Sequence, residues 1–238
     1  MSINAQIAKA TAAQWLRAAA LIVFAVLAGL FLGAGVSQIV RAQTLPAISA
    51  EGESQAADDV RAWLKSTRSL TADFLQQGAD GQFVRGKLTL AQPGKVRFEY
   101  EPSVEMLIVA RDGALFFIDY EVNQLSRYPI NETPLAPLLD PDVIDTVPLS
   151  VQEVAEGANA GSIYVTSTDP KHREYGTLTM VFERIAPGEV NLRSWSVLDG
   201  QGNLTQITLT NAQANVEVAD AAFKFRDPRR RKGPSFRR

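Results

Sequence analysis

The chain has 238 residues, of which 46% are hydrophobic and 21% charged, and its formal net charge is −2. This composition is typical of a globular protein and argues against a disordered one. The chain contains no cysteine, which excludes disulfides, thiolate nucleophiles, cysteine-bound zinc and the cysteine through which bacterial lipoproteins are acylated. Residues 43–225 contain 14 basic and 25 acidic side chains, a net charge of −11. An acidic body of this kind argues against nucleic-acid binding, which needs a basic face.

The first 42 residues have the pattern of a secretory signal peptide. Lys9 and Arg17 precede an uncharged apolar run from residue 18 to residue 37. Val40-Arg41-Ala42 then places small or apolar residues at the positions that a signal peptidase recognises. We therefore expect export, with cleavage after about Ala42. Because the run approaches the ~20 residues that span a bilayer, an uncleaved membrane anchor is the alternative.

A single amphipathic helix is predicted early in the exported chain. Residues 43–53 are polar and contain Pro and Ala, so we expect a flexible lead-in. Ser54 fits an N-cap, Asp58 and Asp59 fall in the first turn, and apolar residues recur at helical spacing to about Thr67. The apolar positions of this helix are Ala57, Val60, Trp63 and Leu64.

From Leu70 onward the hydrophobic period changes to two. Apolar and polar residues alternate through 84–90 and 96–101, and turn signals such as Asp112-Gly113 separate such runs. The pattern continues in 162–168, 176–184, 190–198 and 204–211, and 218–225 is expected to form a turn and a last short strand. About ten strands are therefore predicted, and an antiparallel sheet of that size curls. The basic segment 226–238 contains Pro and Gly, and we expect a disordered tail there.

A proline-punctuated insertion at about 129–157 interrupts the strand pattern. Its prolines separate short apolar segments, and we expect helices near 135–139, 143–146 and 151–156. The insertion is placed to cover the apolar concave face of the curled sheet. Tight packing would give a dry core, and loose packing would leave a cavity for a guest. Both alternatives remain open.

No catalytic or metal-binding pattern is found. The only histidine, His172, lies in the charged, proline-containing segment 169–174, which is typical of a solvated loop. One histidine without cysteine leaves only carboxylates for a transition metal, and no carboxylate cluster has ligand spacing. Asp140-Pro141-Asp142 and Asp58-Asp59 fit a turn and a helix N-terminus. Phosphate-loop, dinucleotide and Gly-x-Ser-x-Gly motifs are also missing. We therefore predict a protein that is not an enzyme and has no cofactor or metal.

Several short motifs occur in an order that resembles a known family. Leu70-Thr71-Ala72-Asp73-Phe74-Leu75-Gln76-Gln77 is followed by Gly86-Lys87-Leu88-Thr89-Leu90 and by Pro93-Gly94-Lys95-Val96-Arg97-Phe98-Glu99-Tyr100. The series continues with Leu107-Ile108-Val109-Ala110-Arg111-Asp112-Gly113 and Thr133-Pro134-Leu135, and it ends with Asp220-Ala221-Ala222-Phe223-Lys224-Phe225. This ordered set, spread over most of residues 54–225, resembles the periplasmic outer-membrane lipoprotein carrier family, LolA.

The resemblance implies a mainly β fold with helices, namely an incomplete (open) antiparallel β-barrel of roughly ten strands with a short-helix lid over an apolar cavity. It implies one domain over 54–225, with the lid insertion at about 129–157. Such a protein is a periplasmic monomer that takes acylated lipoproteins from an inner-membrane ABC-type release complex and delivers them to an outer-membrane acceptor lipoprotein. A carrier of another envelope lipid on the same fold, and a non-carrier envelope interaction protein with a dry core, are the alternatives.

Contacts to the acyl chains are expected from the helix, the sheet and the lid. The residues expected to line the cavity are Trp63, Leu64, Phe74, Val84, Leu88, Leu90, Val96, Phe98, Tyr100, Val109, Phe116 and Ile118. The lid residues are expected to be Leu135, Leu138, Leu139, Val143 and Ile144. For each of these residues, ordinary core packing is the alternative role. Well-studied family members carry a lid-latching arginine immediately before the strand-turn proline, where this chain has Gln92. We therefore expect an altered latch.

Overall fold

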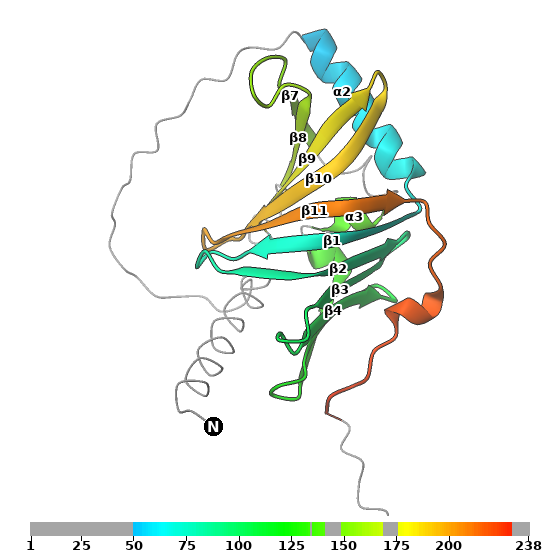
Figure 1. Cartoon of the computed structure of the whole chain (residues 1–238), viewed down its shortest axis with the longest axis vertical. Helices are drawn as coiled ribbons and strands as arrows, with labels where there is room; N and C mark the ends of the chain where they lie inside the picture. The colour runs from blue at the N-terminus through cyan, green and yellow to red at the C-terminus, as the bar shows by residue number, and fades with distance from the viewer. Residues whose placement is uncertain (1–49, 134, 141–148, 169–175, 230–238) are drawn as a thin grey trace, which may run out of the picture.

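Eleven strands form one antiparallel sheet in the computed structural model, which describes residues 50–133, 135–140, 149–168 and 176–229 (Figure 1). The strands are β1 (Ser69–Gln77), β2 (Phe83–Ala91), β3 (Lys95–Tyr100), β4 (Met106–Arg111), β5 (Ala114–Asp119), β6 (Gln124–Pro129), β7 (Leu149–Glu153), β8 (Ser162–Thr168), β9 (Thr177–Ala186), β10 (Glu189–Leu198) and β11 (Leu204–Ala214). The helical elements are α2 (Ala50–Ser66), α3 (Ala136–Leu139) and the 3₁₀ turns η1 (Ile130–Glu132) and η3 (Asp220–Phe223).

The first and last strands of the sheet, β1 and β11, lie next to each other in its middle. The strand order is β6-β5-β4-β3-β2-β1-β11-β10-β9-β8-β7. Successive hairpins therefore lead from β1 outward to β6, and the chain crosses through η1 and α3 to the opposite edge at β7. Hairpins then lead back to β11, which pairs with β1, as in Phe74 opposite Leu209. The edge strands β6 and β7 do not pair with each other, so the sheet remains open.

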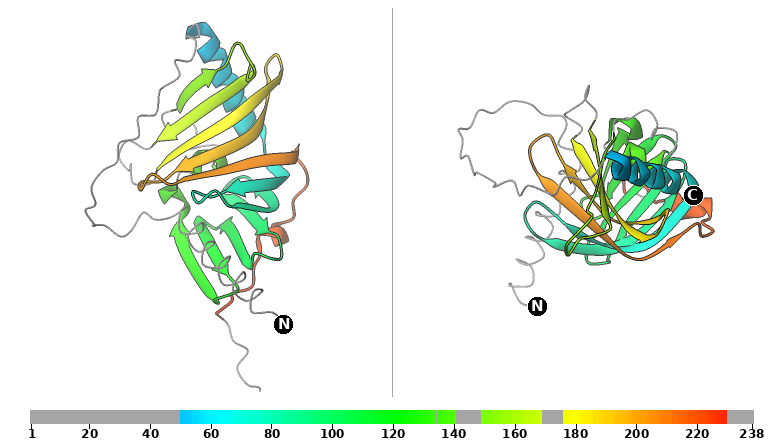
Figure 2. Two further views of the ribbon diagram at one scale, coloured as in Figure 1. Left: turned by 60° about the vertical axis from the view of Figure 1, so that its left-hand side comes forward. Right: turned by 90° about the horizontal axis from the view of Figure 1, so that it is seen from above.

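Helices lie on the concave face of this sheet. The sheet curves around α2, as the view from above in Figure 2 shows. Helix α2 packs on β7 and β10, and it buries Ala56, Val60 and Leu64 in the main core together with Leu138 and Leu139 of α3. A hydrophobic stripe on a helix facing the apolar face of a sheet is the usual way for both elements to leave water.

Two hydrophobic clusters lie on opposite faces of the sheet. The main cluster covers the concave face and includes the inward residues of β1 to β5 and β8 to β11. A smaller cluster lies on the convex face, where Phe223 of η3 packs against Leu107, Val109 and Ile118. Successive side chains of a strand point to opposite faces, so β4 and β5 contribute to both clusters.

Hairpin turns follow the predicted signals. At Asp112-Gly113, between β4 and β5, both residues have positive φ, 52° and 72°. This two-residue turn requires that geometry because its twist matches that of the flanking strands, and Asp-Gly adopts it at low cost. The turn pairs Arg111 with Ala114 and thereby sets the register of both strands.

Three local expectations are corrected by the structure. Helix α2 begins at Ala50 and not at Ser54, so the expected lead-in is partly helical. Residues 149–153 form the edge strand β7 rather than a helix, because β8 offers a free edge for pairing, with Val151 opposite Val165. Residues 223–225 do not form a strand; Phe223 belongs to η3, since β3 and β4 already have neighbours on both sides. Of the tail predicted from Arg226, the structure describes 226–229, and Arg226 stacks on Tyr120.

Several predictions fall on residues outside the described ranges. These are the signal peptide, the helix at 143–146, the loop containing His172 and the segment 230–238. Within the described ranges, none of the helices has both the length and the apolar character needed to cross a bilayer.

Candidate functional site

A small apolar cavity lies on the concave face, between the sheet and the turn that precedes α3. Its volume is about 30 Å³. Six strands and Leu135, the residue before α3, contribute its walls. The lining residues are Gln76, Phe98, Tyr100, Ile108, Leu115, Phe117, Leu135, Trp195, Val197, Thr205 and Ile207.

Aromatic rings form a connected wall beside this cavity. Phe98 meets Trp195 edge-on with 6.1 Å between ring centroids, and Phe74 meets Phe98 and Tyr100 at 5.6 and 5.3 Å. Edge-to-face packing of this kind is favourable and holds the rings in defined positions. The Phe74 ring also lies over Gly86, where an added Cβ would come within 2.6 Å of it. Glycine at position 86 therefore allows this ring to lie flat against the sheet.

The cavity is too small for an acyl chain in this conformation. A single water molecule needs roughly 10–15 Å³ of such volume, so about 30 Å³ holds two water-sized groups. A guest of many methylene groups therefore requires the covering elements to move away from the sheet.

Helix α3 follows Leu135 at the edge of the cavity, and two groups of the β2–β3 turn donate hydrogen bonds to it. The Gly94 backbone N–H donates to the Leu139 carbonyl at 2.7 Å. The Gln92 side-chain Nε2 donates to the carbonyls of Leu64 in α2, at 3.2 Å, and of Leu138 in α3, at 3.5 Å. Both Gln92 bonds are at the long end of the hydrogen-bond range. Gln92 Oε1 is buried and has no partner among the described residues, so this side chain is a weak attachment.

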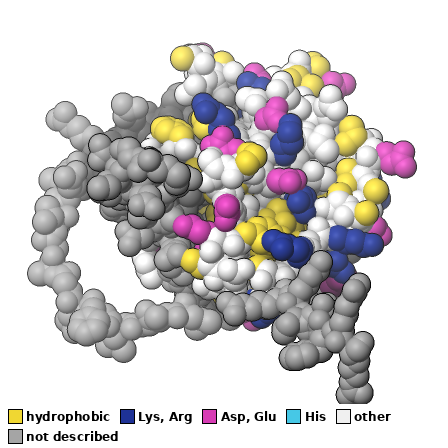
Figure 3. Space-filling model, turned by 60° about the horizontal axis from the view of Figure 1, so that its bottom comes forward, with side chains coloured by type: hydrophobic (Ala, Val, Ile, Leu, Met, Phe, Trp, Pro, Cys, Tyr) yellow, Lys and Arg dark blue, Asp and Glu magenta, His cyan; other side chains and the backbone are white. Residues whose placement is uncertain are grey.

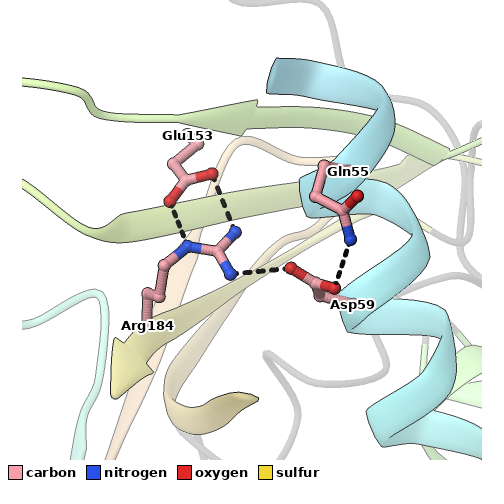
Figure 4. Close-up of polar contacts among 4 residues, drawn as sticks. All are labelled: Gln55, Asp59, Glu153 and Arg184. Atoms are coloured by element: carbon pink, nitrogen blue, oxygen red, sulfur yellow. Dashed lines mark hydrogen bonds and ion pairs between the residues drawn. The ribbon is translucent and has the colours of Figure 1, made fainter. Parts of the chain in front are cut away.

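A cluster of charged groups attaches α2 to strands β7 and β9 (Figure 4). Arg184 of β9 donates from Nε and Nη2 to both carboxylate oxygens of Glu153 in β7, at 2.6 and 2.9 Å, and from Nη1 to Asp59 of α2 at 2.6 Å. Gln55 donates to the second Asp59 oxygen at 2.8 Å. The hydrogen bonds to Glu153, and then the one to Asp59, raise the pKa of the Arg184 guanidinium above its ordinary value, so it remains charged.

Asp59 was expected to mark a helix N-terminus, and the structure corrects this expectation. Its side chain is 7% exposed and forms an ion pair with Arg184. A signal for this cluster was present in the sequence. Arg184 continues the inward-facing series of Leu178, Met180 and Phe182 in β9, and a charge at an inward position needs a buried partner.

Most of the predicted lining residues lie on the concave face. The main cluster and the residues packed against it include Trp63, Leu64, Phe74, Val84, Leu88, Leu90, Val96, Phe98, Tyr100, Leu135, Leu138 and Leu139. Among them, Phe98, Tyr100 and Leu135 line the cavity directly. The remaining predicted lid residues, Val143 and Ile144, lie outside the described residues.

Three predicted lining residues lie on the wrong face of the sheet. Val109, Phe116 and Ile118 belong to the convex cluster around Phe223. The neighbouring residues Ile108, Leu115 and Phe117 line the cavity instead. Both strands are apolar at consecutive positions, so alternation could not decide which side chains point inward. The pairing decides it, because Phe98 lies opposite Ile108, which lies opposite Phe117, and directly paired residues share a face.

The second half of the sheet supplies lining residues that the sequence prediction missed. These are Trp195, Val197, Thr205 and Ile207, and Gln76 of β1 was missed as well. In β11 the residues alternate between buried and exposed from Leu204 to Thr210, so its inward positions could have been identified. In β10 a register shift between Leu192 and Ser194 breaks the alternation and brings Trp195 and Val197 into the same cluster as Leu192. Across the described ranges, no group of three His, Cys, Asp or Glu side chains is placed to hold a metal ion.

Outside the cavity, the face drawn in Figure 3 carries basic and acidic side chains interspersed with small groups of hydrophobic ones. Elsewhere in the described structure, exposed charges also pair with each other, as Lys95 does with Asp220 at 2.7 Å. A surface of mixed sign produces no strong field of one sign on this face.

The fold and the cavity together define a class of protein, namely an open antiparallel β-sheet whose helix-covered concave face encloses an apolar site. The chain belongs to the LolA family. The family model described as "Outer membrane lipoprotein carrier protein LolA" matches residues 65–226.

Curated relatives and solved structures resemble the chain over most of its length. An "Outer-membrane lipoprotein carrier protein" of Cupriavidus necator is 25% identical over 197 residues, which cover 77% of this chain and 89% of the relative. A protein of the same name from Dechloromonas aromatica is 26% identical over 204 residues, which cover 81% and 94%. The solved structure of the "LolA superfamily protein NE2245" from Nitrosomonas europaea is 9% identical, covers 75% of this chain and 99% of its own, and has a TM-score of 0.42.

Proposed function

We propose that this protein is a periplasmic carrier that shelters the acyl chains of lipoproteins during their passage from the inner to the outer membrane. The observation that carries the proposal is an apolar cavity on the concave face of an open sheet, beneath a short helix that few polar contacts hold in place. The chain belongs to a family described by lipoprotein carriage, and its curated relatives bear the same name.

The energetics of transfer favour a loose cavity. Each methylene group moved from water into an apolar site contributes roughly 0.8 kcal/mol, so a long acyl chain gains ~10 kcal/mol before losses. Transfer from a bilayer into the cavity gains little, because both surroundings are apolar. A carrier therefore has to bind the chain better than water does and release it to a slightly better site. The weak attachment of α3 through Gln92 serves this requirement, since opening then breaks few strong hydrogen bonds and is opposed mainly by the burial of Leu135, Leu138 and Leu139.

The route of the cargo belongs to the same proposal. The protein would be exported by the signal peptide, with cleavage after about Ala42. It would receive acylated lipoproteins from an inner-membrane ABC-type release complex and deliver them to an outer-membrane acceptor lipoprotein. The acyl chain would contact the aromatic wall around Phe98 and Trp195, and it would displace α3 from the sheet.

A release assay tests this function. Protein purified from the periplasm after its own export is added to spheroplasts that carry labelled lipoproteins, and soluble complexes are then isolated. Phe98→Glu introduces a charge into the cavity wall and should abolish release. Phe83→Glu is the matched control, because Phe83 is 58% exposed in β2, and it should release as the wild type does. Circular dichroism shows whether both variants are folded.

The possible results separate the alternatives. Release that is lost only in the Phe98→Glu variant supports carriage through this cavity. Failure of the folded wild-type protein, with the membrane machinery shown to be active, contradicts lipoprotein carriage. Co-purifying lipids of another class would then indicate a carrier of another envelope lipid. The small cavity volume favours one further candidate, an envelope interaction protein with a dry core, which would bind no displaceable apolar probe.

A further inference from the structure

One wall of the apolar cavity carries an unsatisfied hydroxyl group. Thr205 lines the cavity from the start of β11 and is 4% exposed. Its Oγ1 is buried and has no hydrogen-bond partner among the described residues. A buried polar atom without a partner costs free energy, and such atoms are rare in folded proteins. Valine has nearly the same shape and would avoid this cost, so the hydroxyl group calls for a partner from outside the chain, and a ligand in the cavity that Thr205 lines can supply one.

A second donor lies beside Thr205. Gln76 of β1 is 3% exposed, and its Oε1 accepts a hydrogen bond of 2.8 Å from the Tyr100 hydroxyl. Burial raises the pKa of the Tyr100 phenol above its ordinary value, so the phenol keeps the proton that it donates. With Oε1 occupied, Gln76 presents its Nε2 as a donor.

The two donors are close enough to bind one atom. Gln76 lies opposite Ile207 in the pairing of β1 with β11, and Thr205 is two residues from Ile207 on the same face. Diagonal neighbours of this kind are separated by about 7 Å between Cα atoms, which places an acceptor within reach of both side chains. β1 and β11 lie side by side in the middle of the sheet, as Figure 1 shows.

The chemistry of the site selects a neutral acceptor. None of the cavity-lining residues is charged, so a carboxylate or phosphate would be buried without a counter-charge, at high cost. A carbonyl oxygen is neutral and has two lone pairs, one for each donor. The remaining walls are apolar and suit the hydrocarbon next to that carbonyl.

We propose that Thr205 Oγ1 and Gln76 Nε2 form a polar subsite that binds the carbonyl oxygen of an acyl linkage, either an ester or an amide. This proposal rests on the proposed function, because it requires that an acyl chain enter the cavity. Without this subsite, the cavity would distinguish ligands only by the apolar area that they bury. The subsite adds recognition of the carbonyl group. The subsite places the acyl linkage at the ends of β1 and β11 that carry Gln76 and Thr205.

The test compares ligands that differ only in the linkage at the end of the chain. Methyl laurate, N-methyllauramide and dodecyl methyl ether have chains of the same length, and the ether has a methylene in place of the carbonyl. Each ligand displaces an environment-sensitive apolar dye from periplasm-purified protein, and the measured quantity is the affinity for each carbonyl ligand relative to the ether. The ester and the amide are separate arms, so the linkage that the site prefers is identified.

Matched variants assign the preference to one side chain. Thr205→Val removes the hydroxyl group and keeps the shape, so the ester-to-ether or amide-to-ether ratio should fall about fivefold, the worth of one hydrogen bond. Thr205→Ser retains the hydroxyl group and should retain the ratio. Thr208→Val makes the same change on the exposed face of β11 and should leave it unchanged. Thr205→Val should also raise the unfolding temperature of the ligand-free protein, because it removes an unsatisfied buried group.

Each outcome decides the proposal. A fall in either ratio that is confined to Thr205→Val supports the subsite. If the ligands bind and Thr205→Val changes neither ratio, the subsite is overturned while acyl binding by the cavity stands. If no ligand displaces the dye from the wild-type protein, the subsite and the acyl-binding function are overturned together.

Discussion

At the scale of single residues, the principal polar feature is a charge at an inward-facing position. Arg184 connects three elements through Asp59 and Glu153. Burying these groups is costly, and their attraction offsets that cost only while every partner is present. Removing Arg184 should therefore destabilise the protein, because the Asp59 carboxylate would stay buried without a counter-charge.

We expect Arg184→Met to lower the free energy of unfolding by about 3 kcal/mol, because Asp59 would remain buried without its counter-ion. Urea unfolding measures this change. Arg193→Met is the matched control, since the pair of Arg193 and Glu183 has side chains that are 61% and 48% exposed, and exposed pairs contribute about 0–1 kcal/mol. Equal losses in the two variants would contradict the role assigned to burial.

Burial of the Tyr100 phenol makes the free energy of unfolding depend on pH in the alkaline range. Below its ordinary pKa of 10.0, the phenol is protonated in both the folded and the unfolded chain and contributes no pH dependence. Above that value the unfolded chain loses the proton, while burial keeps the folded phenol protonated because its pKa is raised. Stability should therefore fall as pH rises above 10, by up to about 1.4 kcal/mol per pH unit.

The Tyr100→Phe variant isolates this effect. Its unfolding free energy should decline less steeply above pH 10 than that of the wild type, as measured by urea unfolding at pH 8 to 11. Parallel declines would show that the Tyr100 phenol ionises as readily in the folded protein as in the unfolded chain.

At the scale of elements, the proposed function makes the contact between α3 and the rest of the protein the control of access to the cavity. Leu135, Leu138 and Leu139 are buried against the main core, and their apolar contacts hold the element over the sheet. The backbone of Gly94 donates a short bond to Leu139, whereas the Gln92 side chain makes only long bonds and leaves its Oε1 without a partner among the described residues. Position 92 is thus where a single side chain can tune the opening.

We predict that Gln92→Arg slows the dissociation of a bound fluorescent acyl probe by about fivefold. A guanidinium offers charged donors to the same carbonyls and leaves no acceptor unsatisfied, and such bonds are roughly twice as strong as neutral ones. Stopped-flow fluorescence measures the rate. Gln206→Arg adds the same charge at an exposed position of β11 and should leave the rate unchanged. A faster dissociation in Gln92→Arg would contradict the latching role.

At the scale of the whole molecule, the pairing of β1 with β11 joins two halves that are distant in sequence. One half comprises β1 to β6 and the other β7 to β11. The outermost strands β6 and β7 each have a single neighbour, while the central pair is protected on both sides. In the proposed carrier function, the open edges would leave the sheet free to spread when a guest enters, because no ladder of hydrogen bonds joins β6 to β7.

The rate of backbone hydrogen exchange should depend on whether a strand lies in the centre or at the edge of the sheet. Backbone amides of β1 and β11 should exchange most slowly, and those of β6 and β7 most rapidly, because local opening begins where neighbours are fewest. Mass spectrometry of peptic fragments measures the exchange for each strand. Protection of β6 and β7 equal to that of the central strands would indicate that the edges are covered in solution.

Much of this fold could be predicted from local pattern. Alternation predicted the antiparallel sheet, helical spacing predicted α2, and Asp112-Gly113 predicted a hairpin that the structure contains. These features depend on residues that are close in sequence. Phe98 and Tyr100 were predicted as lining residues for the same reason, because they lie on the clearly alternating strand β3. Leu135 was predicted as a residue of the lid.

The sequence by itself determined that this protein is a mainly β, open-sheet member of the LolA family, because periodicity and ordered motifs are local properties. Only the tertiary structure decided which side of β4 and β5 faces the cavity, since consecutive apolar residues lack a period and pairing with β3 sets their direction. It also decided that residues 149–153 form a strand, because a free edge of β8 was available. The partners of Arg184 and the unsatisfied hydroxyl group of Thr205 likewise depend on strands that are far apart in the chain and are brought together only by folding.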